Sequence, residues 1–239
     1  MIELQDLCKT FGDIHAVDHI NLHVTRGEIF GFIGPNGAGK TTTIQMMGGL
    51  AAPTSGSVVI HGIPMAKDPV AAKRKIGLIP DRPYLYDKLT GLEFLRFTAD
   101  IYGVSSENFT PEAHRLLEIF SLKNREDELI ESYSHGMKQR LIMASALIHD
   151  PEILIVDEPM VGLDPGGIAL VKNLFKTLST RGKTIFMSTH TLVLAEDLCH
   201  RIGVIHKGRL VATGTLGELK SNARWSDGNL ESIFFELTA

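Results

Sequence analysis

The chain has 239 residues, of which 44% are hydrophobic and 22% are charged, and its formal net charge is −4 at pH 7. This length can bury a hydrophobic core without disulfides or metal ions, and the composition is that of a globular protein, which excludes a disordered or collagen-like chain. The acidic balance does not favour a nucleic-acid-binding protein, because such proteins usually carry a basic surface, although a local basic patch is compatible with it.

Cysteine usage and hydropathy indicate the cellular compartment in which the chain functions. Cys8 and Cys199 show no metal-type spacing along the chain and indicate reduced thiols in an intracellular protein. The N-terminus lacks the basic and apolar regions of a secretory signal. No apolar run reaches the roughly 18 residues that span a bilayer. We therefore expect a soluble chain, for which any membrane role comes through a partner.

Strand patterns dominate the first third of the chain. Alternating or continuous apolar residues, bounded by glycine-containing turns, indicate short strands. These predicted strands cover residues 2–4, 20–24, 29–33, 57–60 and 76–79. One helix is predicted among them, over 41–47, directly after a glycine-rich turn.

The middle of the chain, from 84 to 150, changes to helical patterns. Thr90 and Glu93 have the spacing of a capping box that opens a helix. The pair Thr110-Pro111 predicts a second helix start, because proline is favoured at the first helical position. A third helical pattern covers 137–149 and ends at Asp150-Pro151.

Strands and helices alternate again towards the C-terminus. The predicted elements are strands at 153–156 and 184–188, a helix over about 167–180, a hairpin around Lys207-Gly208 and a helix opened by Thr215 and Glu218. Alternating strands and helices with one helical insertion predict an α/β core and a helical lobe. We assign 1–83 and 151–239 to the core and 84–150 to the lobe.

A P-loop lies between the predicted strand 29–33 and the helix that follows it. Its residues are Gly34, Pro35, Asn36, Gly37, Ala38, Gly39, Lys40 and Thr41, and we include Thr42 in the binding site. Glycines let backbone N–H groups approach phosphate oxygens, and the helix N-terminus adds a favourable dipole. Lys40 is expected to reach the β- and γ-phosphates of a nucleoside triphosphate, and the Thr41 hydroxyl is expected to bind Mg²⁺.

Polar residues follow two buried strands nearer the C-terminus. Asp157 and Glu158 end the strand 153–156, and this end of a strand is where open α/β sheets place ligands. We expect Asp157 to hold Mg²⁺ through water and Glu158 to act as a general base or to orient water. His190 ends the next apolar strand, from which its ring can reach the γ-phosphate. Other histidines, including His61, His149 and His206, are interpreted as structural or surface residues.

The order of these motifs resembles the ATPase domain of the ABC superfamily over essentially the whole chain. The segment 133–140 is similar to the family's signature loop, and 161–164 is similar to its D-loop. The resemblance implies an α/β P-loop NTPase core with a mixed sheet, an N-terminal antiparallel β subdomain and an inserted helical subdomain. It also implies ATP and Mg²⁺ as cofactors and a head-to-tail dimer around two ATP molecules.

Several further site residues rest on the resemblance. Ser134 and Gly136 of the signature are expected to contact the γ-phosphate held by the other subunit, and Asp164 of the D-loop is expected near the nucleotides at the dimer interface. Phe11 occupies the position of an aromatic residue that stacks on adenine. A place in the core of a strand is the alternative for Phe11.

This chain departs from the family pattern in two loops. The signature reads Ser-His-Gly-Met where the family usually has Ser-Gly-Gly-Gln, so that His135 and Met137 replace a glycine and a glutamine. Asp81 stands where the family usually has a glutamine, and a carboxylate there can still bind Mg²⁺. We therefore propose Asp81 as a metal or coupling residue. The alternative is a turn aspartate beside Arg82-Pro83.

The leading interpretation is the ATP-hydrolysing motor of an ABC transporter. The segment 80–90 resembles ATPase subunits of ABC-2-type exporters, with Tyr84, Leu85 and Tyr86 as candidate contacts for a membrane permease, or else as packing at a domain seam. The implied partners are a second copy or a homologous ATPase subunit and an integral membrane permease, with no nucleic acid. The implied location is the cytoplasmic face of the cell membrane.

Two other functions fit part of the sequence. The first is a soluble ABC-type mechanochemical ATPase that acts on ribosomes or DNA, but the chain has one such domain and no long coiled coil. The second is a P-loop kinase, which leaves the signature and the D-loop unexplained.

Overall fold

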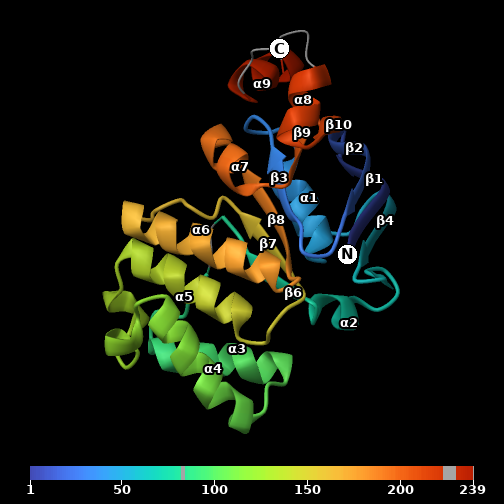
Figure 1. The fold of residues 1–239 in the computed structure, drawn as a ribbon. Coiled ribbons are helices and arrows are strands. Elements are labelled where there is room, and N and C mark those ends of the chain that lie inside the picture. The colour runs from blue at the N-terminus through green and yellow to red at the C-terminus, as the bar shows by residue number, and fades with distance from the viewer. Residues whose placement is uncertain (82–83, 223–229, 239) are drawn as a thin grey trace.

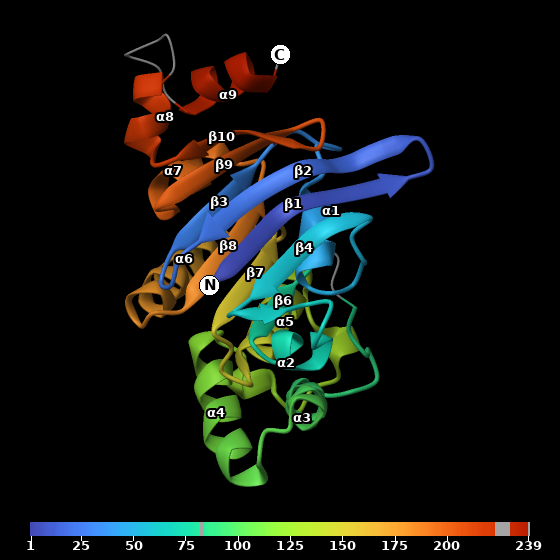
Figure 2. The same ribbon diagram turned by 90° about the vertical axis from the view of Figure 1, so that its right-hand side faces the viewer.

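The structure is a computed structural model that describes residues 1–81, 84–222 and 230–238. Its strands form two sheets (Figures 1 and 2). The first sheet is antiparallel, in the order β2-β1-β4-β5. Its strands are β1 (Ile2–Phe11), β2 (Ile14–Val24), β4 (Ser55–Ile60) and β5 (Ile63–Pro64). The N-terminal antiparallel subdomain implied by the resemblance is therefore present.

The second sheet has the order β10-β9-β3-β8-β7-β6. Its strands are β3 (Ile29–Ile33), β6 (Ile76–Ile79), β7 (Ile153–Asp157), β8 (Thr184–Thr189), β9 (Arg201–His206) and β10 (Arg209–Gly214). Its strands pair in parallel except for the hairpin β9–β10, which is antiparallel. The sheet is therefore mixed, as expected.

Helices cover both faces of this sheet and form the separate lower part of Figure 1. They are α1 (Lys40–Met47), α2 (Pro69–Lys73), α3 (Gly91–Tyr102), α4 (Ser106–Ile119), α5 (His135–Leu147), α6 (Pro165–Thr180), α7 (Leu192–Leu198), α8 (Leu216–Asn222) and α9 (Leu230–Thr238). Within the described ranges, no helix combines the length and the apolar character needed to cross a bilayer.

One core cluster fills the space between the two sheets. Phe30 and Phe32 of β3 point into it and contact Phe186 of β8 at ring-centroid distances of 5.6 and 5.3 Å. Met46 and Met47 of α1 are buried in the same cluster, which places α1 between the sheets (Figure 1). This packing fixes the start of α1 against the end of β3.

A second core cluster lies on the opposite face of the mixed sheet. It joins sheet residues such as Val156 and Ile185 to Phe175 of α6 and to the apolar faces of α3, α4 and α5. The inserted helices therefore share a core with the sheet. A third, smaller cluster joins β9 to α7, α8 and α9 near the C-terminus.

The capping signals in the sequence are present as side-chain hydrogen bonds. The Thr90 hydroxyl accepts from the Glu93 amide at 3.1 Å, and the Glu93 carboxylate accepts from the Thr90 amide at 2.8 Å. Thr215 and Glu218 make the same reciprocal pair at the start of α8. These two predicted helix starts are confirmed.

The predicted helix start at Thr110-Pro111 is wrong. Helix α4 begins at Ser106 with Ser105 as its N-cap, so Pro111 lies inside the helix. The added turn buries Phe109, which is 7% exposed and lies under the Arg96 guanidinium. Burial of a phenylalanine contributes about 1.5–3 kcal/mol, which offsets much of the roughly 3 kcal/mol that an internal proline costs.

Candidate functional site

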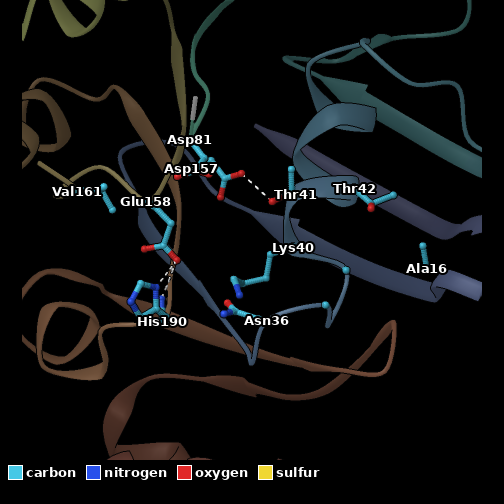
Figure 3. A pocket seen from close by; sticks show the side chains of 12 residues that line it. Ala16, Asn36, Lys40, Thr41, Thr42, Asp81, Asp157, Glu158, Val161 and His190 are labelled. Carbon is cyan, nitrogen blue, oxygen red and sulfur yellow. Dashed lines mark hydrogen bonds and ion pairs between the residues drawn. The ribbon is translucent and has the colours of Figure 1, made fainter. Parts of the chain in front are cut away.

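The site lies where β3, β6, β7 and β8 end, beside the start of α1. A pocket of about 320 Å³ opens there (Figure 3). It is lined by Ala16, Asn36, Gly37, Gly39, Lys40, Thr41, Thr42, Asp81, Asp157, Glu158, Val161 and His190. Parallel strands bring their carboxyl ends to one edge of a sheet, which is why residues from four separate segments meet here.

The loop between β3 and α1 has the backbone shape of a phosphate cradle. Gly39 has φ of 109°, and a Cβ there would collide with the carbonyl oxygen of Ala16. Gly37 has φ of 78°, and the space where its Cβ would lie is open. Position 39 therefore needs glycine because the loop packs closely against Ala16 there, whereas the open space beside Gly37 leaves room for a ligand.

Lys40 lies across this loop. Its side chain is 8% exposed, and Nζ donates to the carbonyl oxygens of Gly34 at 2.7 Å and Pro35 at 3.2 Å. Burial lowers the pKa of the Lys40 ammonium, and the negative charges of Glu158 and Asp157 oppose that shift. The ammonium thus lies in a partly desolvated position, where a phosphate oxygen is a stronger partner than it would be in water.

Thr41 and Asp157 join the P-loop to the end of β7. The Thr41 hydroxyl donates to Asp157 Oδ2 at 2.9 Å (Figure 3). The other carboxylate oxygen of Asp157 accepts from the Ser188 hydroxyl, and Asp157 is 3% exposed. Ser188 pairs with Asp157 in the parallel register of β7 and β8, so sheet pairing fixes this carboxylate.

Glu158 and His190 face each other across the ends of β7 and β8. Glu158 Oε1 lies 2.7 Å from His190 Nδ1 and accepts from the His190 amide at 3.0 Å, while Oε2 accepts from the Thr189 hydroxyl at 3.3 Å. The Glu158 side chain is 15% exposed and that of His190 is 61% exposed. The pair therefore presents one sheltered carboxylate and one accessible ring to the pocket.

The oxygen atoms at this edge fit a magnesium ion. Thr41, Asp81 and Asp157 line the same pocket and offer hydroxyl and carboxylate oxygens, the ligands that Mg²⁺ prefers. The structure thus places Asp81 with the two other residues expected at the metal. Arg82 and Pro83, which belong to the alternative turn interpretation, lie outside the described residues.

The signature residues lie away from this pocket, at the N-terminus of α5. The Ser134 hydroxyl accepts from the Met137 amide at 3.3 Å and caps the helix, and neither Ser134 nor Gly136 lines the pocket. His135 is the first residue of α5 and does not have a positive φ, so its side chain causes no backbone strain there.

The D-loop packs against the signature within the same chain. The His135 ring fills the space beside Gly162, where a Cβ would collide with it. Arg140 Nη2 of α5 lies 3.7 Å from Asp164 Oδ1, and the same Asp164 oxygen caps α6 by accepting from the Gly167 amide at 2.9 Å. Asp164 therefore ties α5 to α6 and does not line the pocket.

Three aromatic candidates are exposed outside the pocket. Phe11 is 52% exposed at the end of β1, with Lys9 Nζ 5.0 Å from its ring centroid. Tyr84 and Tyr86 are 80% and 47% exposed and contact each other edge to face. Tyr86 also contacts Phe97 of α3 at 5.4 Å, which anchors this segment on the helical lobe.

Two residues of the site were missed by sequence reasoning. Ala16 lines the pocket, and Ser188 orients Asp157. Val161, the first residue of the D-loop segment, also lines the pocket. Ser188 has a signal in the sequence, because it precedes Thr189 and His190 at the end of an apolar strand. Ala16 has none, because its position depends on the turn from β1 to β2.

Comparisons with known proteins agree with one another. A family model described as "ABC transporter" matches residues 17–161. The chain is 43% identical to the bacitracin transport ATP-binding protein BcrA of Bacillus licheniformis, over 94% of this chain and 72% of that protein.

Two solved structures have the same fold. A structure described as an ATP-binding subunit of an ABC transporter has a TM-score of 0.95 and 34% identity, with all of both chains covered. A dimeric structure of the ATP-binding cassette MJ0796, in a post-hydrolysis state bound to ADP and Pi, has a TM-score of 0.83 and 28% identity, and covers 90% of this chain and 99% of that one.

Proposed function

This chain belongs to the ABC transporter family, as an ATP-binding and ATP-hydrolysing subunit, and we propose that it closes head-to-tail with a second copy or a homologous subunit around two Mg-ATP. Each nucleotide would lie between the P-loop of one subunit and the signature residues Ser134 and Gly136 of the other. The observation that carries the proposal is the pocket, in which Lys40, Thr41, Asp157, Glu158 and His190 converge.

The proposed roles follow from the positions of these side chains. Lys40 turns from the Gly34 and Pro35 carbonyls to the β- and γ-phosphates. Glu158 accepts the proton of the attacking water, and His190, whose ring lies against Glu158, orients that water at the γ-phosphate. The water oxygen bonds to the γ-phosphorus as the bond from that phosphorus to the β–γ bridging oxygen breaks, and Lys40 offsets the charge that develops on the leaving ADP.

The metal would be held by Thr41, Asp157 and Asp81. When bound, Mg²⁺ would neutralise negative charge on the phosphates. The Ser188 hydroxyl orients the Asp157 carboxylate, which supports its role as a ligand.

The proposed partner is an integral membrane permease, which would hold the subunit at the cytoplasmic face of the membrane. We divide the chain into a core of 1–83 and 151–239 and a helical subdomain of 84–150, and we propose Tyr84, Leu85 and Tyr86 on the latter as permease contacts. Exposure of Tyr84 and Tyr86 supports this role, because large aromatic side chains are enriched at interfaces. Phe11 is proposed to stack on adenine, which its exposure permits.

Affinity purification of the subunit from its native membranes in mild detergent tests the transporter assignment. We expect a multi-span membrane protein in stoichiometric amount. The double variant Tyr84→Ala/Tyr86→Ala should lose this protein. The control Phe235→Ala, which removes an aromatic side chain of α9 whose exposure lies between those of the two tyrosines, should retain it. Ribosomal proteins or DNA-repair factors in place of a permease would assign the same ATPase to another machine.

A further inference from the structure

A cluster of potential metal ligands lies on the antiparallel sheet, outside the nucleotide pocket. It consists of Cys8 on β1 and Asp18 and His19 on β2, and one ligand atom of each lies within 4.8 Å of the others. Cys8 is 8% exposed, whereas the side chains of Asp18 and His19 are 18% and 64% exposed. The cluster therefore has a sheltered sulfur and an opening to solvent.

The irregular pairing of β1 with β2 brings these side chains together. The register shifts between Leu4 and Leu7 and again between Leu7 and Lys9, so the regular alternation of side chains is interrupted here. His19 has φ of 53°, which directs its ring towards β1. Bulges of this kind turn side chains away from the direction that regular pleating would give them.

The imidazole of His19 is oriented as a metal ligand usually is. Its Nδ1 lies 2.7 Å from Asp6 Oδ1, while Nε2 lies 3.8 Å from Asp18 Oδ1. Metal-bound histidines generally donate their second ring N–H to a carboxylate, which fixes the tautomer and the direction of the ring. Here Asp6 takes that place, and Nε2 is directed towards the other ligands.

Cys8 and Asp18 are the other two candidate ligands. The Cys8 sulfur accepts the His19 amide N–H at 3.2 Å and donates to the Asp6 carbonyl oxygen at 3.6 Å, so the thiol must release its proton when it binds a metal ion. Asp18 Oδ2 accepts from Arg209 Nε at 2.6 Å, which positions the carboxylate and leaves Oδ1 on the side of His19. Arg209 also neutralises part of the charge, so it weakens the attraction of Asp18 for a cation.

We propose that Cys8, Asp18 and His19 bind a divalent transition-metal ion of the Zn²⁺ class, with Asp6 positioning His19. A thiolate and an imidazole favour such ions over Mg²⁺ and Ca²⁺, which take oxygen ligands. Three protein ligands and an exposed fourth side correspond to a four-coordinate ion that also holds water. The bound ion would clamp β1 to β2 close to Ala16, which lines the nucleotide pocket.

Titration of the reduced, nucleotide-free protein with Co²⁺ tests this site. Co²⁺ replaces Zn²⁺ in sites of this type, and a bound thiolate gives a charge-transfer absorption in the near ultraviolet. We expect that band to saturate at one Co²⁺ per chain and to disappear when Zn²⁺ is added. Co²⁺ bound by Thr41, Asp81 and Asp157 would give no such band, because these residues offer only oxygen.

Matched variants identify the ligands. Cys8→Ser and His19→Ala should each abolish the band, and Asp6→Asn should weaken Co²⁺ binding by about 10- to 100-fold. Cys199→Ser changes the other free cysteine and should retain the band. His61→Ala should also retain it, since His61 is an exposed histidine with a similar positive φ of 50° and so controls for backbone strain.

Absence of a thiolate band in the wild-type protein, with circular dichroism and ATP binding intact, would overturn the proposal. An unchanged band in Cys8→Ser would also overturn it. If Cys8→Ser fails to fold, Asp18→Asn provides the second test, because the amide keeps its bond from Arg209 while it loses the charge that a metal ion needs. Equal Co²⁺ affinity of Asp18→Asn and the wild type would contradict the assignment of Asp18.

Discussion

Glu158 occupies a strained backbone position at the point where the proposed chemistry takes place. Its φ is 51°, a conformation that costs a non-glycine residue roughly 1–3 kcal/mol. Bonds from the His190 amide, the His190 ring and the Thr189 hydroxyl hold the carboxylate in place. Residues at the end of β8 thus orient the side chain of Glu158, which follows β7.

Glu158→Gln should abolish ATP hydrolysis while it preserves ATP binding. The amide cannot accept a proton from water, and loss of a general base lowers rates by about 10²- to 10⁴-fold. Phosphate release and equilibrium nucleotide binding measure the two quantities. Glu107→Gln, on the exposed start of α4, is the matched control. Normal turnover by Glu158→Gln would remove Glu158 from this role.

Asp81→Ala should shift the Mg²⁺ dependence of ATP hydrolysis to higher concentrations. Asp81 lines the pocket with Thr41 and Asp157, so its loss removes one carboxylate from the proposed metal site. ATPase rates measured across a range of Mg²⁺ concentrations test this, with the exposed Asp13→Ala as control. The proposal for Asp81 fails if both the rate and its Mg²⁺ dependence stay as in the wild type.

At the scale of elements, the junction of α3, α5 and β6 depends on a partly buried histidine. His149 follows α5, and its ring stacks on Tyr102 of α3 at a centroid distance of 3.6 Å. Its Nε2 lies 3.0 Å from the Ile76 carbonyl oxygen of β6, while Nδ1 is buried without a hydrogen-bond partner. Burial lowers the pKa of His149 to about 4.

The folded protein should become less stable in acid because of His149. In the folded protein His149 binds a proton less tightly than in the unfolded chain, where a histidine has a pKa of about 6.5. Protonation of His149 therefore favours unfolding. The stability that neutral His149 contributes is fully present above about pH 6.5 and is lost as the pH falls to about 4, by up to roughly 3 kcal/mol.

Urea unfolding of the wild type and of His149→Gln at pH 7.5 and pH 5 measures this effect. Glutamine stays neutral and can donate to the Ile76 carbonyl, so the variant should lose less stability on acidification than the wild type does. His114→Gln, on the exposed face of α4, should behave as the wild type. Equal acid sensitivity of wild type and His149→Gln would show that His149 does not titrate in this way.

At the scale of the whole molecule, the groups proposed to act on one nucleotide are divided between two surfaces. The pocket contains the P-loop and the residues after β7 and β8, whereas Ser134 is exposed at the start of α5 and lines no part of it. In the proposed dimer, the α5 N-terminus of a second subunit would complete the site. The N–H groups of that helix end suit a phosphate.

Glu158→Gln with ATP should form a dimer that is visible as a doubled mass in light scattering. Slow hydrolysis would preserve the phosphates that bridge the two subunits. Glu158→Gln/Lys40→Ala should stay monomeric under the same conditions, because it lacks the ammonium that holds the phosphates. A doubled mass that persists without ATP, or in the double variant, would contradict nucleotide-driven closure.

Most strands and helices, the capped starts of α3 and α8, and the residues at the ends of β3, β7 and β8 were predictable from the sequence alone, whereas α2, α7, α9 and β5 were not predicted. These signals are local, because periodicity, caps and turns are set by a few consecutive residues. The family's motifs rest on the same local information.

Tertiary structure decided what depends on pairing between distant segments. Ser188 orients Asp157 only through the register of β7 and β8, and Ala16 reaches the P-loop only through the path of β1 and β2. Cys8 has no metal-type spacing along the chain, yet a bulged register places it beside His19. A register depends on packing summed over whole sheets, so no short stretch of sequence specifies it.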